Sequence, residues 1–125
     1  MSWIDHLNAQ LVSKGVSACA LLGAADGAVW ADHGSGLSAG EAQNIAKLFS
    51  NPASAFATGV MVGGVKFFCT RASDDTIAAR KDQRGLFLCK SDKAIVVALH
   101  DETMNAGTCS TFAGKAADYF RSLGF

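Results

Sequence analysis

The chain has 125 residues, of which 50% are hydrophobic and 18% are charged. This length fits one domain of about 100–150 residues, residues 1–125, and excludes a multidomain or repeat protein. Eleven Lys and Arg residues balance eleven Asp and Glu residues, which argues against a nucleic-acid binder. No apolar stretch reaches the ~18 residues that cross a bilayer, and the first residues lack a basic, apolar leader. We therefore expect a soluble, intracellular domain.

Four cysteines, Cys19, Cys69, Cys89 and Cys109, are widely and almost evenly spaced. They form no CxxC pair, and no histidine stands beside them at metal-ligand spacing, which argues against a zinc site. We expect reduced thiols that serve as small buried apolar side chains, with no metal and no other cofactor.

The first part of the chain predicts a helix followed by a pair of strands. Ser2 suits an N-cap, and Ile4, Leu7 and Leu11 recur at helical spacing until Gly15. A turn signal at residues 26–27 separates two apolar runs, as in a hairpin. These patterns predict a helix over about 2–13 and antiparallel strands over 16–23 and 28–31.

A second helix is predicted after Ser38. Ser38 and Glu41 have capping-box spacing and precede apolar residues that share one helical face, so the helix ends near Ser50. The pair Asn51-Pro52 can open one further short turn, because proline is tolerated at the first helical position.

The rest of the chain predicts a meander of strands and a last helix. Short apolar runs separated by turn signals predict antiparallel strands over 60–62, 65–70, 76–79, 86–89 and 94–99. The last helix begins near Asn105 or Thr108 and ends at Ser122. Because the helices form separate blocks, we expect an α+β domain on one antiparallel sheet.

Catalytic signatures are weak throughout. The segment Gly59 to Lys66 resembles a P-loop only in part, because its lysine stands one place late and no Ser or Thr follows. The histidines at positions 6, 33 and 100 pair with no nucleophile. We expect a protein without catalytic residues.

Two aromatic residues on the terminal helices suggest a binding groove. A helical wheel places Trp3 off the apolar arc of the first helix and Tyr119 at the edge of the arc of the last. Half-exposed rings on rigid elements suit a polyproline II ligand. The same positions also suit rings that only cover the core, and both interpretations remain open.

A basic series occupies the meander, namely Lys66, Arg71, Arg80, Lys81, Arg84 and Lys90. It suggests a contact surface for an acidic partner protein or a phosphoinositide headgroup. A solvated sheet face is the alternative.

The chain resembles the profilins, small proteins that bind actin monomers. The resemblance lies in the opening Ser2-Trp3-Ile4-Asp5-His6-Leu7-Asn8, in the segments 51–67, 79–81, 90–95 and 100–104, and in Ala117-Asp118-Tyr119-Phe120 with Gly124-Phe125. It implies a sheet of six to seven strands with the N- and C-terminal helices on one face and short helices on the other. It also implies a mostly monomeric regulator of actin polymerisation, in the cytoplasm and cytoskeleton, that binds monomeric actin, proline-rich proteins and phosphoinositides.

The resemblance also implies residue roles. The polyproline groove would contain Trp3, His6, Trp30, Tyr119 and Phe125. The actin site would contain Lys66, Arg71, Arg80, Lys81, Lys90, Asn105 and Thr108, and the phosphoinositide site Arg80, Lys81 and Arg84. The sequence departs from the family at His6, usually tyrosine, at Asp82, commonly glycine, and at His100, commonly aromatic. A trafficking adaptor or small-ligand sensor on the same scaffold, without actin binding, is the alternative function.

Overall fold

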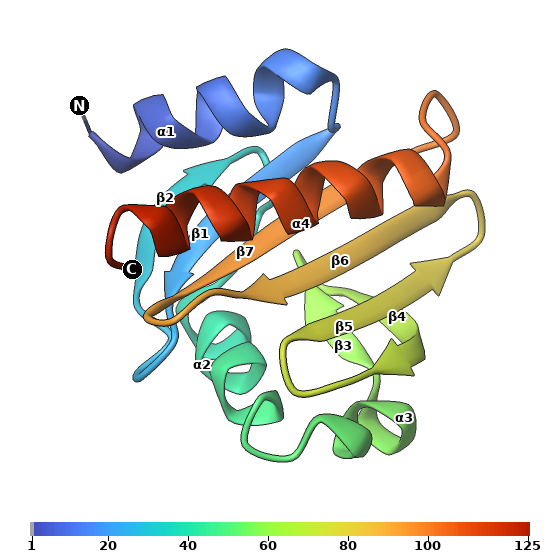
Figure 1. The fold of residues 1–125 in the computed structure, drawn as a ribbon. Coiled ribbons are helices and arrows are strands. Elements are labelled where there is room, and N and C mark those ends of the chain that lie inside the picture. The colour runs from blue at the N-terminus through green and yellow to red at the C-terminus, as the bar shows by residue number, and fades with distance from the viewer. Residues whose placement is uncertain (1) are drawn as a thin grey trace.

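A computed structural model describes residues 2–125 and contains the predicted helices and strands (Figure 1). The helices are α1 (Trp3–Gln10), α2 (Ala39–Leu48), α3 (Ala55–Thr58) and α4 (Ala106–Ser122), with single 3-10 turns at Val12–Lys14 and Pro52–Ser54. The strands are β1 (Ala18–Gly23), β2 (Val29–His33), β3 (Val60–Val62), β4 (Val65–Ala72), β5 (Thr76–Lys81), β6 (Arg84–Lys90) and β7 (Ala94–His100).

The strands form one seven-stranded sheet in the order β2-β1-β7-β6-β5-β4-β3. Every neighbouring pair is antiparallel, and β7 returns to pair with β1, which joins the first hairpin to the meander. The α+β fold with one central antiparallel sheet is confirmed.

The sheet is covered on both faces. Helices α1 and α4 lie side by side on one face (Figure 1), where Leu7, Phe87 and Phe120 are among the buried side chains. Helices α2 and α3 cover the other face, where Ile45 and Phe67 are buried. Because apolar side chains pack on both faces, β1 and β7 are buried along their whole length. The predicted placement of the terminal helices is confirmed.

Local signals explain where the helices begin. Ser2 and Ser38 each cap a helix and form capping boxes with Asp5 and Glu41. The first helix is shorter than predicted, because α1 ends at Gln10 and one 3-10 turn continues to Gly15, which has φ of 96°. The turn predicted at Asn51-Pro52 is present, and the additional helix α3 follows it.

The cysteines are all free thiols, and Cys19, Cys89 and Cys109 are buried as predicted. Burial raises the pKa of Cys19 and Cys109 to about 12 and that of Cys89 to about 11. Cys69 is the exception, because it lies on β4 near the sheet edge and is only partly buried. Within residues 2–125 no cluster of side chains could hold a metal ion, and no helix is long and apolar enough to cross a membrane.

Candidate functional site

A cluster of aromatic rings lies between the two terminal helices. Trp3 and His6 stand one turn apart on α1, Trp30 projects from β2, Tyr119 from α4, and Phe125 follows the end of α4. All of them are half-buried. We call this cluster the aromatic groove, and it contains every residue that the sequence assigned to polyproline binding.

Trp3 is the centre of the aromatic groove. Its ring stacks on Trp30, with centroids 4.9 Å apart and an interplanar angle of 28°. The edge of Phe125 meets it at 4.8 Å and 88°. A hollow of about 590 Å³ opens beside these rings, and His6 and Leu123 also line it. The rings therefore form a surface with rigid walls.

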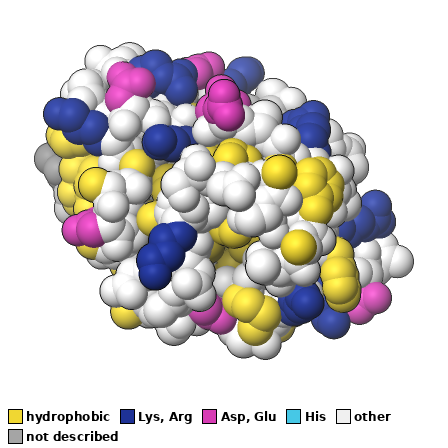
Figure 2. Space-filling view, turned by 90° about the horizontal axis from the view of Figure 1, so that it is seen from below, with side chains coloured by type: hydrophobic (Ala, Val, Ile, Leu, Met, Phe, Trp, Pro, Cys, Tyr) yellow, Lys and Arg dark blue, Asp and Glu magenta, His cyan; other side chains and the backbone are white. Residues whose placement is uncertain are grey.

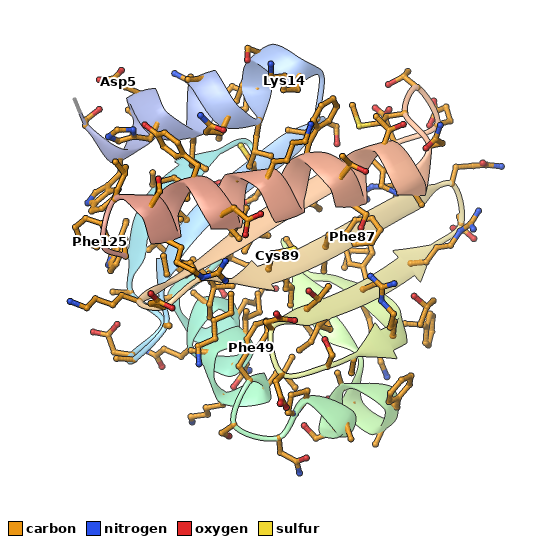
Figure 3. The ribbon with its side chains drawn as sticks, in the orientation of Figure 1. Asp5, Lys14, Phe49, Phe87, Cys89 and Phe125 are labelled. Carbon is orange, nitrogen blue, oxygen red and sulfur yellow. The ribbon has the colours of Figure 1, made fainter. Side chains whose placement is uncertain are left out.

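Phe125 is held in place by its backbone. Its N–H donates to the carbonyl of Phe120 at 2.9 Å, and its carbonyl accepts from the Ser91 hydroxyl at 2.7 Å. In Figure 3 the residue lies beyond the last turn of α4, next to the start of α1. These bonds fix one wall of the groove.

His6 and Tyr119 form the other end of the groove. Nδ1 of His6 lies 2.6 Å from the Tyr119 hydroxyl, and the ring centroids are 5.5 Å apart. The histidine thus occupies the position usual for tyrosine and makes a polar contact between α1 and α4.

The basic residues of the meander divide between two sheet faces. Lys66 and Arg71 of β4 and Arg80 of β5 project on the face that carries α4, beyond the strands that this helix covers. A hollow of about 300 Å³ separates Arg71 from the first turn of α4. The structure therefore brings Lys66, Arg71 and Arg80 to the same face as the start of α4.

Asn105 and Thr108 stand at the start of α4. The Asn105 side chain accepts from the Thr108 N–H at 2.7 Å and so caps the helix. The polar side chain of Asn105 is therefore engaged within the protein, while the residue itself remains exposed.

Lys81 and Arg84 lie on the opposite face. They pair across the β5–β6 hairpin, and the Arg84 guanidinium lies 5.5 Å from the ring centre of Phe67, a residue of the core under α2. Arg80 bends over the same turn, where its Nε donates to the Asp82 carbonyl at 3.1 Å. Asp82 has φ of 55°, a conformation that favours glycine. The hairpin therefore gathers the three predicted phosphoinositide-binding residues from two faces.

Lys90 is not gathered with the other basic residues. It is the last residue of β6, at the other end of the strand from Arg84, and it lines a hollow together with Asp26 and Trp30. The sequence alone grouped Lys90 with the other basic residues of the meander and did not reveal this separation.

Exposed apolar residues complete the face of Lys66 and Arg80. Phe68 is 59% exposed and lies beside Lys66, whose Nζ is 5.7 Å from its ring centre. Met61 pairs with Lys66 across β3 and β4 and is also exposed. Phe56, 57% exposed, lies on α3 next to β4. We call Met61, Lys66, Phe68, Arg71 and Arg80, together with Phe56 of the adjoining helix α3, the outer face.

The sequence prediction missed the apolar members of the outer face. One signal was available: Phe67 and Phe68 are consecutive in a strand, so only one can enter the core under α2. In Figure 2, hydrophobic and basic side chains adjoin along the right-hand edge, on the side where Figure 1 shows β4 and the β5–β6 hairpin. This mixture of exposed rings and cations is typical of protein contact surfaces.

Comparison with known proteins decides the family. The profilin family model matches residues 1–125. The chain belongs to the profilin family. It is 36% identical to profilin-1 of Dictyostelium discoideum, and the alignment covers 100% of both chains. The solved structure of profilin IB of Acanthamoeba castellanii superposes with a TM-score of 0.93 at 32% identity, over 99% of this chain and 100% of that one.

Two more distant profilin structures share the fold and contain ligands. One is mouse profilin IIa in complex with a double repeat from the FH1 domain of mDia1, with a TM-score of 0.80 and 18% identity over 100% of both chains. The other is a complex of LokiProfilin2 with rabbit actin, with a TM-score of 0.74 and 14% identity over 96% of this chain and 92% of that one.

Proposed function

We propose that this profilin binds monomeric actin on its outer face and a proline-rich segment in its aromatic groove, and so regulates actin polymerisation. The observation that carries the proposal is the aromatic groove, in which Trp3 stacks on Trp30 and stays half-exposed. The two distant complexes, with an FH1 repeat and with actin, support the same two ligand classes.

The groove suits a proline-rich ligand for a physical reason. A polyproline II helix is already extended, so it loses little conformational entropy when it binds. Its pyrrolidine rings can pack on the faces of Trp3, Trp30 and Phe125, and its free carbonyls need donors. The indole N–H groups are donors of that kind, and so is the Tyr119 hydroxyl when it does not donate to His6.

The outer face suits a larger protein. Phe56 and Phe68 offer apolar contact area, and Arg71 and Arg80 offer planar charged groups at the same surface. Aromatic and arginine side chains carry much of the binding energy of protein interfaces. Asn105 and Thr108 would border this contact at the start of α4. We leave Lys81 and Lys90 out of this proposed contact, because Lys81 projects from the opposite sheet face and Lys90 lies at the end of β6 beside Asp26 and Trp30.

The β5–β6 hairpin is our proposed phosphoinositide site. Arg80, Lys81 and Arg84 surround one exposed turn, which would place three cations near a phosphorylated headgroup. Since Arg80 also belongs to the outer face, the headgroup and actin would compete for it.

We propose that the protein acts through binding alone, without catalysis, as a monomer in the cytoplasm and at the cytoskeleton. Family membership supports this proposal. The exposed aromatic groove also favours it over a trafficking adaptor or small-ligand sensor, neither of which needs Trp3 and Tyr119 at the surface.

One experiment tests both surfaces together. The protein is loaded on immobilised poly-L-proline, and monomeric actin is then passed over the column. Retention of the protein, followed by retention of actin on it, is expected, because the groove and the outer face use different residues. A Trp3→Ala protein should pass through the column but still bind actin in solution. Failure of the native protein to hold either ligand would contradict the proposal.

A further inference from the structure

The aromatic groove continues beyond Trp30 and Phe125. These two rings also line a second hollow of about 510 Å³, which lies on the side away from Trp3. A third hollow of about 440 Å³ shares Ala24, Ala25, Asp26 and Lys90 with the second. The surface therefore has a continuous furrow, which begins as the aromatic groove and carries charged side chains in the second and third hollows.

Lysines dominate the charged part of the furrow. Lys90 and Lys93 line the second hollow, and Lys47 and Lys90 line the third. We call these three residues the lysine annex. Among the ion pairs of residues 2–125, none involves a lysine of the annex.

The acidic residues of the furrow already have partners. Asp26 accepts from the backbone N–H of Ala28 at 3.0 Å, and so stabilises the β1–β2 turn. Asp92 pairs with Arg121, whose Nε lies 3.6 Å from its carboxylate. Arg121 thus offsets the charge of Asp92, and Asp26 keeps one negative charge against three lysines, so the charged part of the furrow has a net positive charge.

We propose that the lysine annex binds an acidic side chain that flanks the proline-rich segment of a partner protein. This inference rests on the proposed binding of proline in the aromatic groove. A polyproline II helix is stiff, so a residue just beyond it is carried in a defined direction into the adjoining hollow. Opposite charge in that hollow would select an aspartate or glutamate at the position.

The annex also gives the furrow two unlike ends. The rings follow one another from Tyr119 through His6 and Trp3 to Trp30 and Phe125, with successive centroids 4.8–6.1 Å apart. The lysine annex adjoins Trp30 and Phe125 and does not reach the other end of the groove, which His6 and Tyr119 form. An acidic flank would therefore help at one end of the ligand only, and would set the direction in which the partner lies.

The test uses the intact protein and five blocked peptides. Each contains octaproline, flanked by two glutamates at its amino end, two glutamates at its carboxyl end, two lysines at either end in turn, or alanines at both ends. Dissociation constants are measured by tryptophan fluorescence at low and moderate salt. At low salt, we expect glutamates at one end alone to tighten binding about three- to tenfold, as one or two exposed ion pairs would. Raising the salt should reduce this gain.

A matched pair of variants locates the effect. In Lys90→Gln/Lys93→Gln the ratio between the alanine and glutamate peptides should fall to below about twofold. In Lys14→Gln, which removes a lysine charge from an exposed position beyond the end of α1 and outside the furrow, the ratio should persist.

The outcomes separate the inference from the proposed function. If the alanine-flanked peptide does not bind, the proline groove is wrong and the inference falls with it. Binding of that peptide with equal affinity for every flank would overturn the inference alone. Tighter binding of the lysine-flanked peptides would also overturn it. So would an equal gain for the peptide with amino-terminal glutamates and the peptide with carboxyl-terminal glutamates. A gain from glutamates that survives in Lys90→Gln/Lys93→Gln would have the same consequence.

Discussion

The Nδ1 atom of His6 and the hydroxyl of Tyr119 lie 2.6 Å apart and join α1 to α4 at one end of the aromatic groove. A neutral imidazole that accepts this bond occupies the only O–H donor of the tyrosine. A protonated imidazole must donate instead, which leaves the Tyr119 O–H free to donate to a ligand carbonyl. The proton on His6 therefore decides what Tyr119 can offer.

We predict that protonation of His6 strengthens proline binding, because it frees the Tyr119 O–H for a ligand carbonyl. One additional hydrogen bond corresponds to about a three- to tenfold gain in affinity. Octaproline titrations at several pH values measure the effect. In His6→Tyr the affinity should not vary with pH, and parallel curves for the two proteins would contradict the prediction.

Trp3→Ala should weaken binding of proline peptides by at least about 30-fold, equivalent to ~2 kcal/mol, because Trp3 contacts both Trp30 and Phe125. Trp3 is only half-buried, so thermal unfolding should remain a single cooperative transition at a somewhat lower temperature. Leu7→Ala serves as a contrast, since Leu7 is fully buried and its loss should cost about 2–5 kcal/mol of stability. If Trp3→Ala unfolds the protein as Leu7→Ala does, Trp3 is a core residue and not a ligand contact.

Arg80→Glu should weaken binding of monomeric actin about tenfold or more, whereas Lys81→Glu should change it less than about threefold. The two residues are consecutive but project from opposite sheet faces, and only Arg80 lies on the outer face. Actin sequestration is measured at low and moderate salt, and added salt should reduce the difference in actin affinity between the native protein and Arg80→Glu. Equal losses of actin affinity in both variants would show that the sheet face from which a residue projects does not determine whether it contacts actin. Octaproline binding should remain normal in both.

Glu41 links α2 to the β3–β4 turn, and its loss should destabilise the fold. Its carboxylate accepts from the N–H groups of Gly63 and Gly64, both at 2.9 Å, in addition to its capping box with Ser38. Partial burial works against ionisation, but these donors outweigh it and hold the pKa of Glu41 below its ordinary value. Glu41→Gln should cost about 1 kcal/mol at neutral pH.

The lowered pKa of Glu41 also gives a pH dependence. The stabilisation is complete above the unfolded-state pKa, about 4.3 for glutamate, and is lost as pH falls through the lower folded-state pKa. The difference in unfolding free energy between native protein and Glu41→Gln should therefore be constant from pH 7 to about 5 and shrink at lower pH. Denaturant unfolding at several pH values tests this, and a difference that grows on acidification would refute it.

Gly85 faces His100 across β6 and β7, and we predict that the pair is coupled. A methyl group at position 85 would overlap Nε2 of His100, whose buried ring stacks on Phe87. Gly85→Ala should cost about 1–3 kcal/mol in the native protein but much less in a His100→Ala background. A double-mutant cycle with additive effects would show that the imidazole can move aside.

The sequence predicted the fold well because its signals were local. The N-cap at Ser2, the capping-box spacing at Ser38 and the short apolar runs between turn signals located the elements, and the resemblance to profilins supplied their arrangement. Two residues of the aromatic groove followed for the same reason, since Trp3 lies off the apolar arc of its helix and Tyr119 at the edge of its own. The resemblance to profilins supplied His6, Trp30 and Phe125. The outer face was harder to predict: whether Phe68, Arg80 or Lys81 meets solvent depends on which strands α4 leaves uncovered. The position of Lys90 likewise depends on sheet register.

Helix α4 links the two proposed binding surfaces, since it begins at the outer face and carries Tyr119 near its other end. Its 17 residues correspond to about 25 Å of rigid helix. In the proposed function, an actin monomer would thus be presented to the proline-bearing partner at a fixed reach and in a fixed orientation. Any freedom in the delivery of actin would then have to come from the partner's own chain.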